Sequence, residues 1–287
     1  MKIVVASGKG GVGKSMIASS LALLFSQYGK VVACDCDVDA PNLGLWLGVT
    51  EYDSTEKVSV SEKAKIVNQE ACDEGILKVC TFNAIEEKNG EYLVNPFLCE
   101  GCGACKVVYP NAVVITPVKN AEIRTRQTKH TFPLISAQLY PGESGSGKIV
   151  TQLRKRTDAY DHDLMILDAA AGIGCPVIAS IRGADYAVLV TEPTPSGFSD
   201  LQRILQTVNH FNIPYGIVVN KWDIHRETFE KMKNWSKERY LGRISFDKKV
   251  IESIVNLKPV IETDAEVVNE ITNLFTEVRG RTRSFDR

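Results

Sequence analysis

The sequence lacks long apolar runs and a dominant charge. No run of about 18 or more apolar residues occurs in the 287-residue chain, so we expect no membrane span and no stable membrane insertion. The formal net charge is −1, which gives no field to recruit nucleic acid or anionic lipid. The chain enters an apolar run at Lys2, leaving no room for a signal peptide. We therefore expect a cytoplasmic globular protein without a nucleic-acid partner.

Short apolar runs alternate with amphipathic stretches along most of the chain. This alternation predicts an α/β fold whose mostly parallel sheet is covered by helices on both faces. In such sheets, ligands bind at the carboxyl ends of the strands. The predicted strands are 2–6, 31–35, 164–167, 187–191 and 215–220, with 132–135 as a further candidate, and the predicted helices are 14–28, 148–160, 198–211 and 225–239.

A glycine-rich segment with the sequence GKGGVGKS follows the first predicted strand and opens the first predicted helix. Glycines in this context let backbone N–H groups converge on phosphate oxygens at a helix N-terminus. Lys14 would neutralise the β- and γ-phosphates, and the Ser15 hydroxyl would complete the coordination of Mg²⁺. The predicted nucleotide-binding residues here are Gly8, Lys9, Gly10, Gly11, Val12, Gly13, Lys14, Ser15 and Met16.

Polar residues follow several of the other predicted strands. Asp35, Asp37 and Asp39 come after the second strand, and the alternative for this group is a solvated turn. Asp168 ends an apolar strand, the Walker-B position, where a carboxylate holds Mg²⁺ partly through water. Together with Ser15, Asp37 and Asp168 are the predicted Mg²⁺ residues.

Two further residues are candidates for contacts with nucleotide. Gly172 would offer a backbone N–H to the γ-phosphate, as a switch requires. Asn220, at the end of another apolar strand, can donate and accept hydrogen bonds at a base edge, although a strand-terminal turn is the alternative.

A second glycine-rich segment, GESGSGK at 142–148, also has phosphate-loop spacing. Ile149 stands where the Mg²⁺-binding hydroxyl is needed, so we expect a surface loop without nucleotide.

The chain has eight cysteines, a pattern that in a cytosolic protein indicates metal or redox chemistry rather than disulfides. Cys99, Cys102 and Cys105 form a C-x-x-C-x-x-C run like that of bacterial ferredoxins, in which the fourth ligand of a cluster comes from the other run. Cys80 is that fourth cysteine, while Tyr109 replaces the cysteine that a second cluster would need. We therefore predict one 4Fe–4S cluster, with zinc as the main alternative.

This cysteine-rich stretch interrupts the strand–helix alternation. We expect an inserted small α+β ferredoxin-like domain at 53–117, within a nucleotide-binding domain formed by 1–52 and 118–287. Cys34 and Cys36 are interpreted as strand packing, and Cys72 and Cys175 receive no role. The apolar residues of 265–278 have helical spacing with an acidic polar face, which favours a core helix over a membrane-surface helix.

The motifs together resemble those of the deviant Walker-A ATPases, which include MinD, ParA, the Mrp-type iron–sulfur carriers and the nitrogenase iron protein. The resemblance rests on the loop at 8–15 with its extra lysine, DCDVDAPN at 35–42, DAAAGIGCP at 168–176, VTEPTP at 190–195 and VVNKWD at 218–223. It is greatest to MinD-superfamily ATPases with an inserted ferredoxin domain.

The resemblance implies roles for two residues. Lys9 would reach across a nucleotide-sandwiched dimer to the partner's phosphates, as an arginine finger does. Asp37 would position the attacking water. With Lys14, Lys9 and Asp37 imply an ATP-hydrolysing enzyme that binds ATP, ADP and Mg²⁺. Met16 departs from the family, because it replaces a common hydroxyl residue, so we expect one side-chain contact to the α-phosphate to be missing.

The implied assembly is a homodimer, or a heterodimer with a paralogue, formed across ATP. ATP turnover would drive electron or cluster delivery to a client protein, or the maturation of that client. The alternative is a spatial organiser of the ParA or MinD kind, in which the cluster is structural or sensory.

Overall fold

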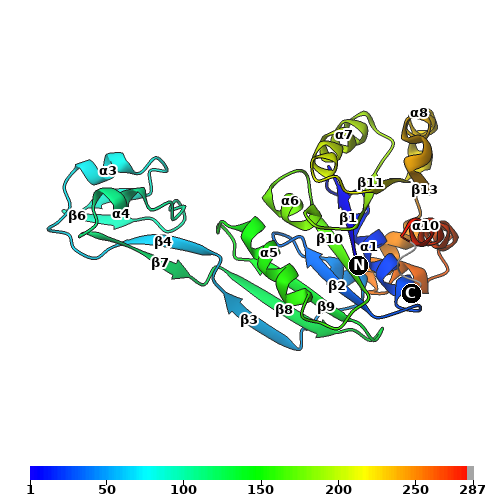
Figure 1. Cartoon of the computed structure of the whole chain (residues 1–287), viewed down its shortest axis with the longest axis horizontal. Coiled ribbons are helices and arrows are strands. Elements are labelled where there is room, and N and C mark those ends of the chain that lie inside the picture. The colour runs from blue at the N-terminus through cyan, green and yellow to red at the C-terminus, as the bar shows by residue number, and fades with distance from the viewer. Residues whose placement is uncertain (283–287) are drawn as a thin grey trace. The chain divides into compact units, whose positions relative to one another are not determined.

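The computed structural model describes residues 1–282, which form two compact units. The large unit consists of Met1–Thr55, Ile123–Gln138 and the chain from Ser146 onward. The small unit consists of Glu56–Glu122 and Leu139–Gly145. Figure 1 shows the elements of both units.

A nine-stranded sheet of order β13-β12-β11-β1-β10-β2-β9-β8-β3 forms the frame of the fold. The six pairings from β13 to β9 are all parallel. β8 and β9 are joined by a short turn at 128–132, which requires an antiparallel pair. The strands are β1 (Lys2–Ser7), β2 (Val31–Cys36), β3 (Ser54–Val58), β8 (Ala121–Gln127), β9 (Pro133–Leu139), β10 (Leu164–Ala171), β11 (Tyr186–Thr191), β12 (Tyr215–Asn220) and β13 (Tyr240–Ile244).

Helices cover both faces of this sheet. Side chains at alternate positions of a strand point to opposite faces. Ile3 and Val5 of β1 share one core with residues of α1 and α10, whereas α5, α6 and α7 pack on the other face. The helices are α1 (Lys14–Phe25), α2 (Leu43–Trp46), α5 (Ser146–Thr157), α6 (Cys175–Ile181), α7 (Pro195–His210), α8 (Arg226–Ser236), α9 (Lys248–Val255) and α10 (Val267–Arg281), with 3-10 turns at Trp222–Ile224, Lys237–Arg239 and Val260–Glu262.

The predicted α/β fold with a mostly parallel sheet is confirmed, but three strands of the sheet were not predicted. These are β13, a short edge strand with Gly242 and Arg243 in its five residues, and the strands β3 and β8. The predicted surface loop at 142–148 is wrong at its end, because α5 begins at Ser146. Gly147 packs there so closely that an added Cβ would lie 3.0 Å from the Cβ of Cys175.

The C-terminal helix α10 packs into the core, as its acidic polar face led us to expect. Val267, Ile271, Leu274, Phe275 and Val278 are all buried. Among the described residues, no helix is both long enough and apolar enough to cross a bilayer.

The small unit has two antiparallel strand pairs and two short helices. β4 (Ser61–Ile66) pairs with β7 (Val113–Val118), and β5 (Ile85–Lys88) pairs with β6 (Glu91–Val94). The helices are α3 (Gly75–Val79) and α4 (Ala104–Val108). The segment Leu139–Gly145 also belongs to this unit, to which an ion pair and a hydrogen bond hold it. Glu143 forms an ion pair of 3.2 Å with the buried Lys63, and the Ser144 carbonyl accepts a 2.9 Å hydrogen bond from Asn120.

Candidate functional site

The glycine-rich loop between β1 and α1 has a backbone that requires glycine at two positions. Gly11 and Gly13 have φ angles of 77° and 92°, in the left-handed region. A Cβ on Gly13 would also lie 2.2 Å from Nδ2 of Asn220. α1 begins at Lys14 without a side-chain cap, so its first N–H groups remain available to an anion.

Lys14 and Asp168 form a buried ion pair at the start of α1. The Nζ of Lys14 lies 3.1 Å from Oδ1 of Asp168, and their side chains are 7% and 0% exposed. Burial raises the pKa of Asp168, an effect that the charge of Lys14 and the hydroxyl of Ser15 oppose. Oδ2 of Asp168 is buried and has no hydrogen-bond partner among residues 1–282. The Ser15 hydroxyl and a carboxylate with one unsatisfied oxygen are a donor set that fits a hard cation such as Mg²⁺.

The acids after β2 have three different environments. Asp35 is fully buried opposite Asp168 in the strand register, and burial and then the Asp168 charge raise its pKa well above the usual value. Its oxygens accept hydrogen bonds from the N–H groups of Asp37 (3.2 Å) and Leu43 (3.0 Å), so it organises the loop. Partial burial raises the pKa of Asp37, against the lowering effect of Lys14 nearby. Asp39 is exposed.

Asn220 and the residue after it brace the glycine-rich loop. Nδ2 of Asn220 donates to the Val12 carbonyl at 2.8 Å, and its Oδ1 accepts from the Lys221 N–H. Nζ of Lys221 donates to the Gly11 carbonyl at 3.0 Å. Asn220 is buried beneath the loop in this arrangement, so base recognition by its side chain remains a prediction.

Lys9, the extra lysine of the loop, pairs with residues of its own chain. Nζ of Lys9 lies 2.7 Å from Oε1 of Glu192 and 3.4 Å from Oγ of Ser196. The hydrogen bond and charge of Glu192 raise the pKa of Lys9. Glu192 and Lys221 had no predicted role, although each directly follows a buried strand, which is the signal that could have identified them.

Gly172 follows β10 with a φ angle of 97°. Its N–H donates to the Ser7 carbonyl at 3.0 Å, so the predicted switch residue is bonded to the end of β1 in this structure.

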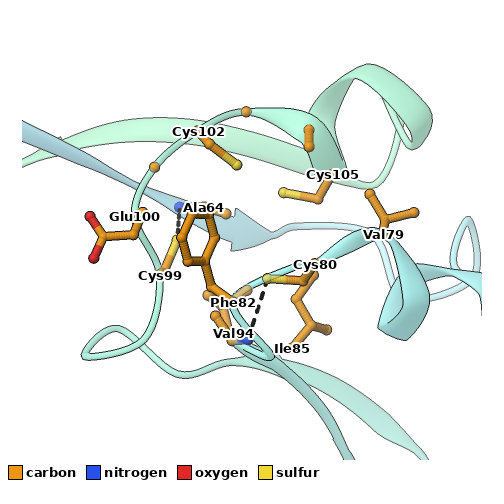
Figure 2. A pocket seen from close by; sticks show the side chains of 14 residues that line it. Ala64, Val79, Cys80, Phe82, Ile85, Val94, Cys99, Glu100, Cys102 and Cys105 are labelled. Atoms are coloured by element: carbon orange, nitrogen blue, oxygen red, sulfur yellow. Dashed lines mark hydrogen bonds between the residues drawn. The ribbon is translucent and has the colours of Figure 1, made fainter.

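The four cysteines predicted as ligands line one pocket of the small unit (Figure 2). Cys99 and Cys105 are buried, Cys80 is half-buried and Cys102 is exposed. The backbone N–H groups of Ala64 and Ala84 donate to the Sγ atoms of Cys99 and Cys80, each at 3.3 Å. The remaining wall includes the apolar residues Val79, Phe82, Ile85 and Val94.

The loop that carries three of these cysteines depends on glycine. Gly101 and Gly103 have φ angles of 64° and 80°, and a Cβ on Gly101 would lie 2.0 Å from the Glu62 carbonyl oxygen of β4. Within residues 1–282, no three His, Cys, Asp or Glu side chains are grouped so that they could hold a single metal ion.

The other cysteines do not line this pocket, although Cys72 packs against the same small core as Cys99 and Cys105. Cys34 and Cys36 are buried side by side with 3.6 Å between their sulfur atoms, as expected for strand packing. Cys175 is exposed at the start of α6. Tyr109, which occupies the missing cysteine position, donates a 2.6 Å hydrogen bond to Asp73, and this contact raises the pKa of Tyr109 to about 12.

The glycine-rich loop, its buried lysine and the carboxylates at the strand ends define a P-loop nucleotide-binding protein. Residues 3–260 match the CobQ/CobB/MinD/ParA nucleotide binding domain family, and the chain belongs to this family.

Two relatives and one solved structure illustrate the similarity. An uncharacterized protein of Methanocaldococcus jannaschii is 36% identical over 280 residues, covering 97% of this chain and 96% of that protein. The iron-sulfur cluster carrier protein of Pyrococcus abyssi is 24% identical over 303 residues, covering 97% of this chain and 88% of that protein. The structure of the septum site-determining protein MinD complexed with Mg-ADP, from Pyrococcus horikoshii, has a TM-score of 0.63 at 16% identity. That alignment covers 99% of this chain and 98% of that one, and it establishes a shared fold.

Proposed function

We propose that this protein binds and hydrolyses ATP and dimerises when ATP is bound. The observation that carries the proposal is the buried ion pair of Lys14 and Asp168, in which the second carboxylate oxygen has no hydrogen-bond partner in the described part of the chain. An unsatisfied buried oxygen is costly, and a bound cation would satisfy it. The pair lies at the first turn of the helix that follows the glycine-rich loop, where phosphates bind.

The surrounding residues supply the other requirements of phosphoryl transfer. Lys14 would bind the terminal phosphates, and Ser15 and Asp168 would hold Mg²⁺. When bound, Mg²⁺ neutralises charge on the phosphate oxygens. Asp37 would orient a water molecule and accept its proton, a role that suits a carboxylate whose pKa is raised by partial burial.

Lys9 would contact the phosphates of the partner subunit. Its side chain is 40% exposed although it lies on the phosphate loop itself, and its Nζ contacts Glu192 and Ser196, which lie outside the loop. An exposed lysine at this position of the loop can reach the phosphates bound to a second subunit. The partner would be a second copy or a paralogue.

Paired substitutions of acids on the β2–α2 loop test hydrolysis. Asp37→Asn should lower kcat for ATP hydrolysis by about 10²- to 10⁴-fold and leave ATP binding intact, because general-base catalysis contributes about that much. The matched control is Asp39→Asn on the same loop, since Asp39 is exposed, and it should retain activity. Equal losses in the two variants, or no binding of ATP with Mg²⁺ by the unmodified protein, would contradict the proposal.

We further propose that the small unit carries one 4Fe–4S cluster on Cys80, Cys99, Cys102 and Cys105. The apolar walls and the N–H groups that point at two of the sulfur atoms support this assignment, because iron–sulfur sites share both features.

Iron, sulfide and zinc analysis of the anaerobically purified protein tests the cluster. We expect about four iron and four sulfide per chain, the composition of a [4Fe–4S] centre. Cys80→Ser should reduce both, whereas Cys72→Ser should not, because Cys72 lies outside the pocket. Zinc without sulfide would overturn the assignment.

The two parts would act together, with ATP turnover controlling electron or cluster delivery to a client protein. The similarity to a protein named an iron-sulfur cluster carrier supports this role. Cluster transfer to an apo-acceptor should change when ATP and Mg²⁺ are added. Membership in the family of MinD and ParA supports the alternative of a spatial organiser, and a patterned distribution of the protein in cells, without ATP-dependent transfer, would favour it.

A further inference from the structure

The carboxylate of Glu192 lies between two lysines at the phosphate loop. Its Oε1 is 2.7 Å from Nζ of Lys9, and its Oε2 is 3.8 Å from Nζ of Lys221. The Glu192 side chain is only 12% exposed, directly after β11. One carboxylate therefore links the loop lysine to a lysine at the end of β12.

The two lysines differ in how firmly they are held. Lys221 has a left-handed backbone with φ 53°, and its Nζ also donates to the Gly11 carbonyl at 3.0 Å. The Lys9 side chain is 40% exposed and that of Lys221 is 31% exposed, and beyond Glu192 the Nζ of Lys9 has a 3.4 Å contact with the Ser196 hydroxyl. If Lys9 leaves the carboxylate, the Nζ of Lys221 still lies 3.8 Å from Oε2 of Glu192 and can balance its charge.

We propose that Glu192 is a positioning residue that holds Lys9 on its own subunit and is displaced when Lys9 binds the partner's phosphates. This inference rests on the proposed ATP-dependent dimer and adds to it the group with which the phosphate must compete. Glu192 thereby sets the ATP-bound protein concentration at which the dimer forms.

The exchange has a simple physical basis. The Lys9 ammonium is a donor only, so it binds either a carboxylate or a phosphate oxygen. Its pKa, raised by Glu192, keeps it charged at neutral pH in the subunit that is waiting for a partner. Lys221 then balances the Glu192 charge, which would otherwise repel the incoming phosphate.

Removing the Glu192 charge tests the proposal. Glu192→Gln preserves the side-chain shape but weakens its attraction to Lys9. Partly exposed ion pairs correspond to a factor of about two to five per site, and a homodimer makes the exchange twice. We therefore expect the dimer dissociation constant, measured by analytical ultracentrifugation with a non-hydrolysable ATP analogue and Mg²⁺, to fall by about 4- to 25-fold.

A second ion pair offers a matched control. Glu227 pairs with Lys231 at 2.7 Å on the surface of α8, and Glu227→Gln should leave the dissociation constant unchanged. In the Lys9→Ala background, Glu192→Gln should give no gain, because no lysine remains to be released.

Lys9 reactivity gives a reading that does not depend on dimerisation. Glu192→Gln should increase the rate at which Lys9 is acetylated in the nucleotide-free protein.

The possible outcomes separate the inference from the proposed function. If the unmodified protein dimerises and the dissociation constant of the Glu192→Gln dimer is equal or higher, the inference fails and the proposed function stands. If neither protein dimerises with the ATP analogue, the proposed dimer fails, and the exchange with it. If only Glu192→Gln dimerises and its Lys9 reacts faster, the inference is supported.

Discussion

Substitution of alanine for Gly10, Gly11 or Gly13 of the phosphate loop should destabilise the protein by amounts that increase in this order. Gly10 has no left-handed backbone, and a Cβ there would lie 3.8 Å from the nearest atom, so Gly10→Ala fits. Gly11 has a φ of 77° with open space around it, so Gly11→Ala adds only backbone strain. Gly13 has a φ of 92°, and its Cβ would also lie 2.2 Å from Nδ2 of Asn220.

These differences set the expected magnitudes. An L-residue in the left-handed region costs about 1–2 kcal/mol, so Gly11→Ala should lose about that much relative to Gly10→Ala. Gly13→Ala has the same strain and also displaces Asn220 from the Val12 carbonyl, to which it donates at 2.8 Å. A buried donor left unpaired costs about 1–3 kcal/mol, giving a total of about 2–5 kcal/mol. The change in unfolded-chain entropy is common to the three variants and cancels in the comparison.

Urea unfolding of the nucleotide-free protein measures the series. The Asn220→Ala background supplies the control, since removal of the amide should reduce the cost of Gly13→Ala to that of Gly11→Ala. Equal losses for Gly11→Ala and Gly13→Ala in the otherwise unmodified chain would refute the packing of Asn220 against the loop. Equal losses for Gly10→Ala and Gly11→Ala would refute the strain argument.

Two other predictions concern stability outside the loop. The hydrogen bond to Asp73 raises the pKa of Tyr109 to about 12, above its unfolded value of about 10, so this stabilisation is complete below about pH 10 and is lost as the pH rises toward 12. Between these values the unfolding midpoint should fall more steeply for the unmodified protein than for Tyr109→Phe, and parallel curves would contradict the assignment. Phe275 is 5% exposed with its ring centroid 4.8 Å from that of Phe25, so Phe275→Ala should cost about 3–5 kcal/mol in urea unfolding. The exposed Thr276→Ala on the same helix should change little, and a similar loss in both variants would argue against core packing of α10.

Much of the large unit could be predicted because its signals are local. Apolar runs identified β1, β2, β10, β11 and β12, and their alternation with helices required a mostly parallel sheet. The edge strand β13 has no such run, because one side of an edge strand lacks a pairing partner and Gly242 and Arg243 are tolerated there. The start of α5 was placed too late because Ser146 and Gly147 are typical of loops. Close packing of Gly147 against Cys175 overrides that preference.

In the candidate site, too, some features could be predicted from the sequence and others could not. Lys14, Ser15 and Asp168 were assigned from the loop motif and from the position of an acid after an apolar strand. The pairing of Lys9 with Glu192 could not be predicted, because 183 residues separate them in the chain. The sequence also could not show that Asn220 donates to the loop carbonyl rather than standing free.

By itself, the sequence determined the sheet class, the phosphate loop and the order of the motifs along the chain. Glycine positions, apolar periodicity and cysteine spacing are properties of short segments, so they can be recognised without a structure. Tertiary structure decided which distant groups meet: Glu192 with two lysines, Asn220 with the loop, and the segment 139–145 with the small unit. Such contacts depend on strand order, register and packing, which bring together residues that no local pattern relates.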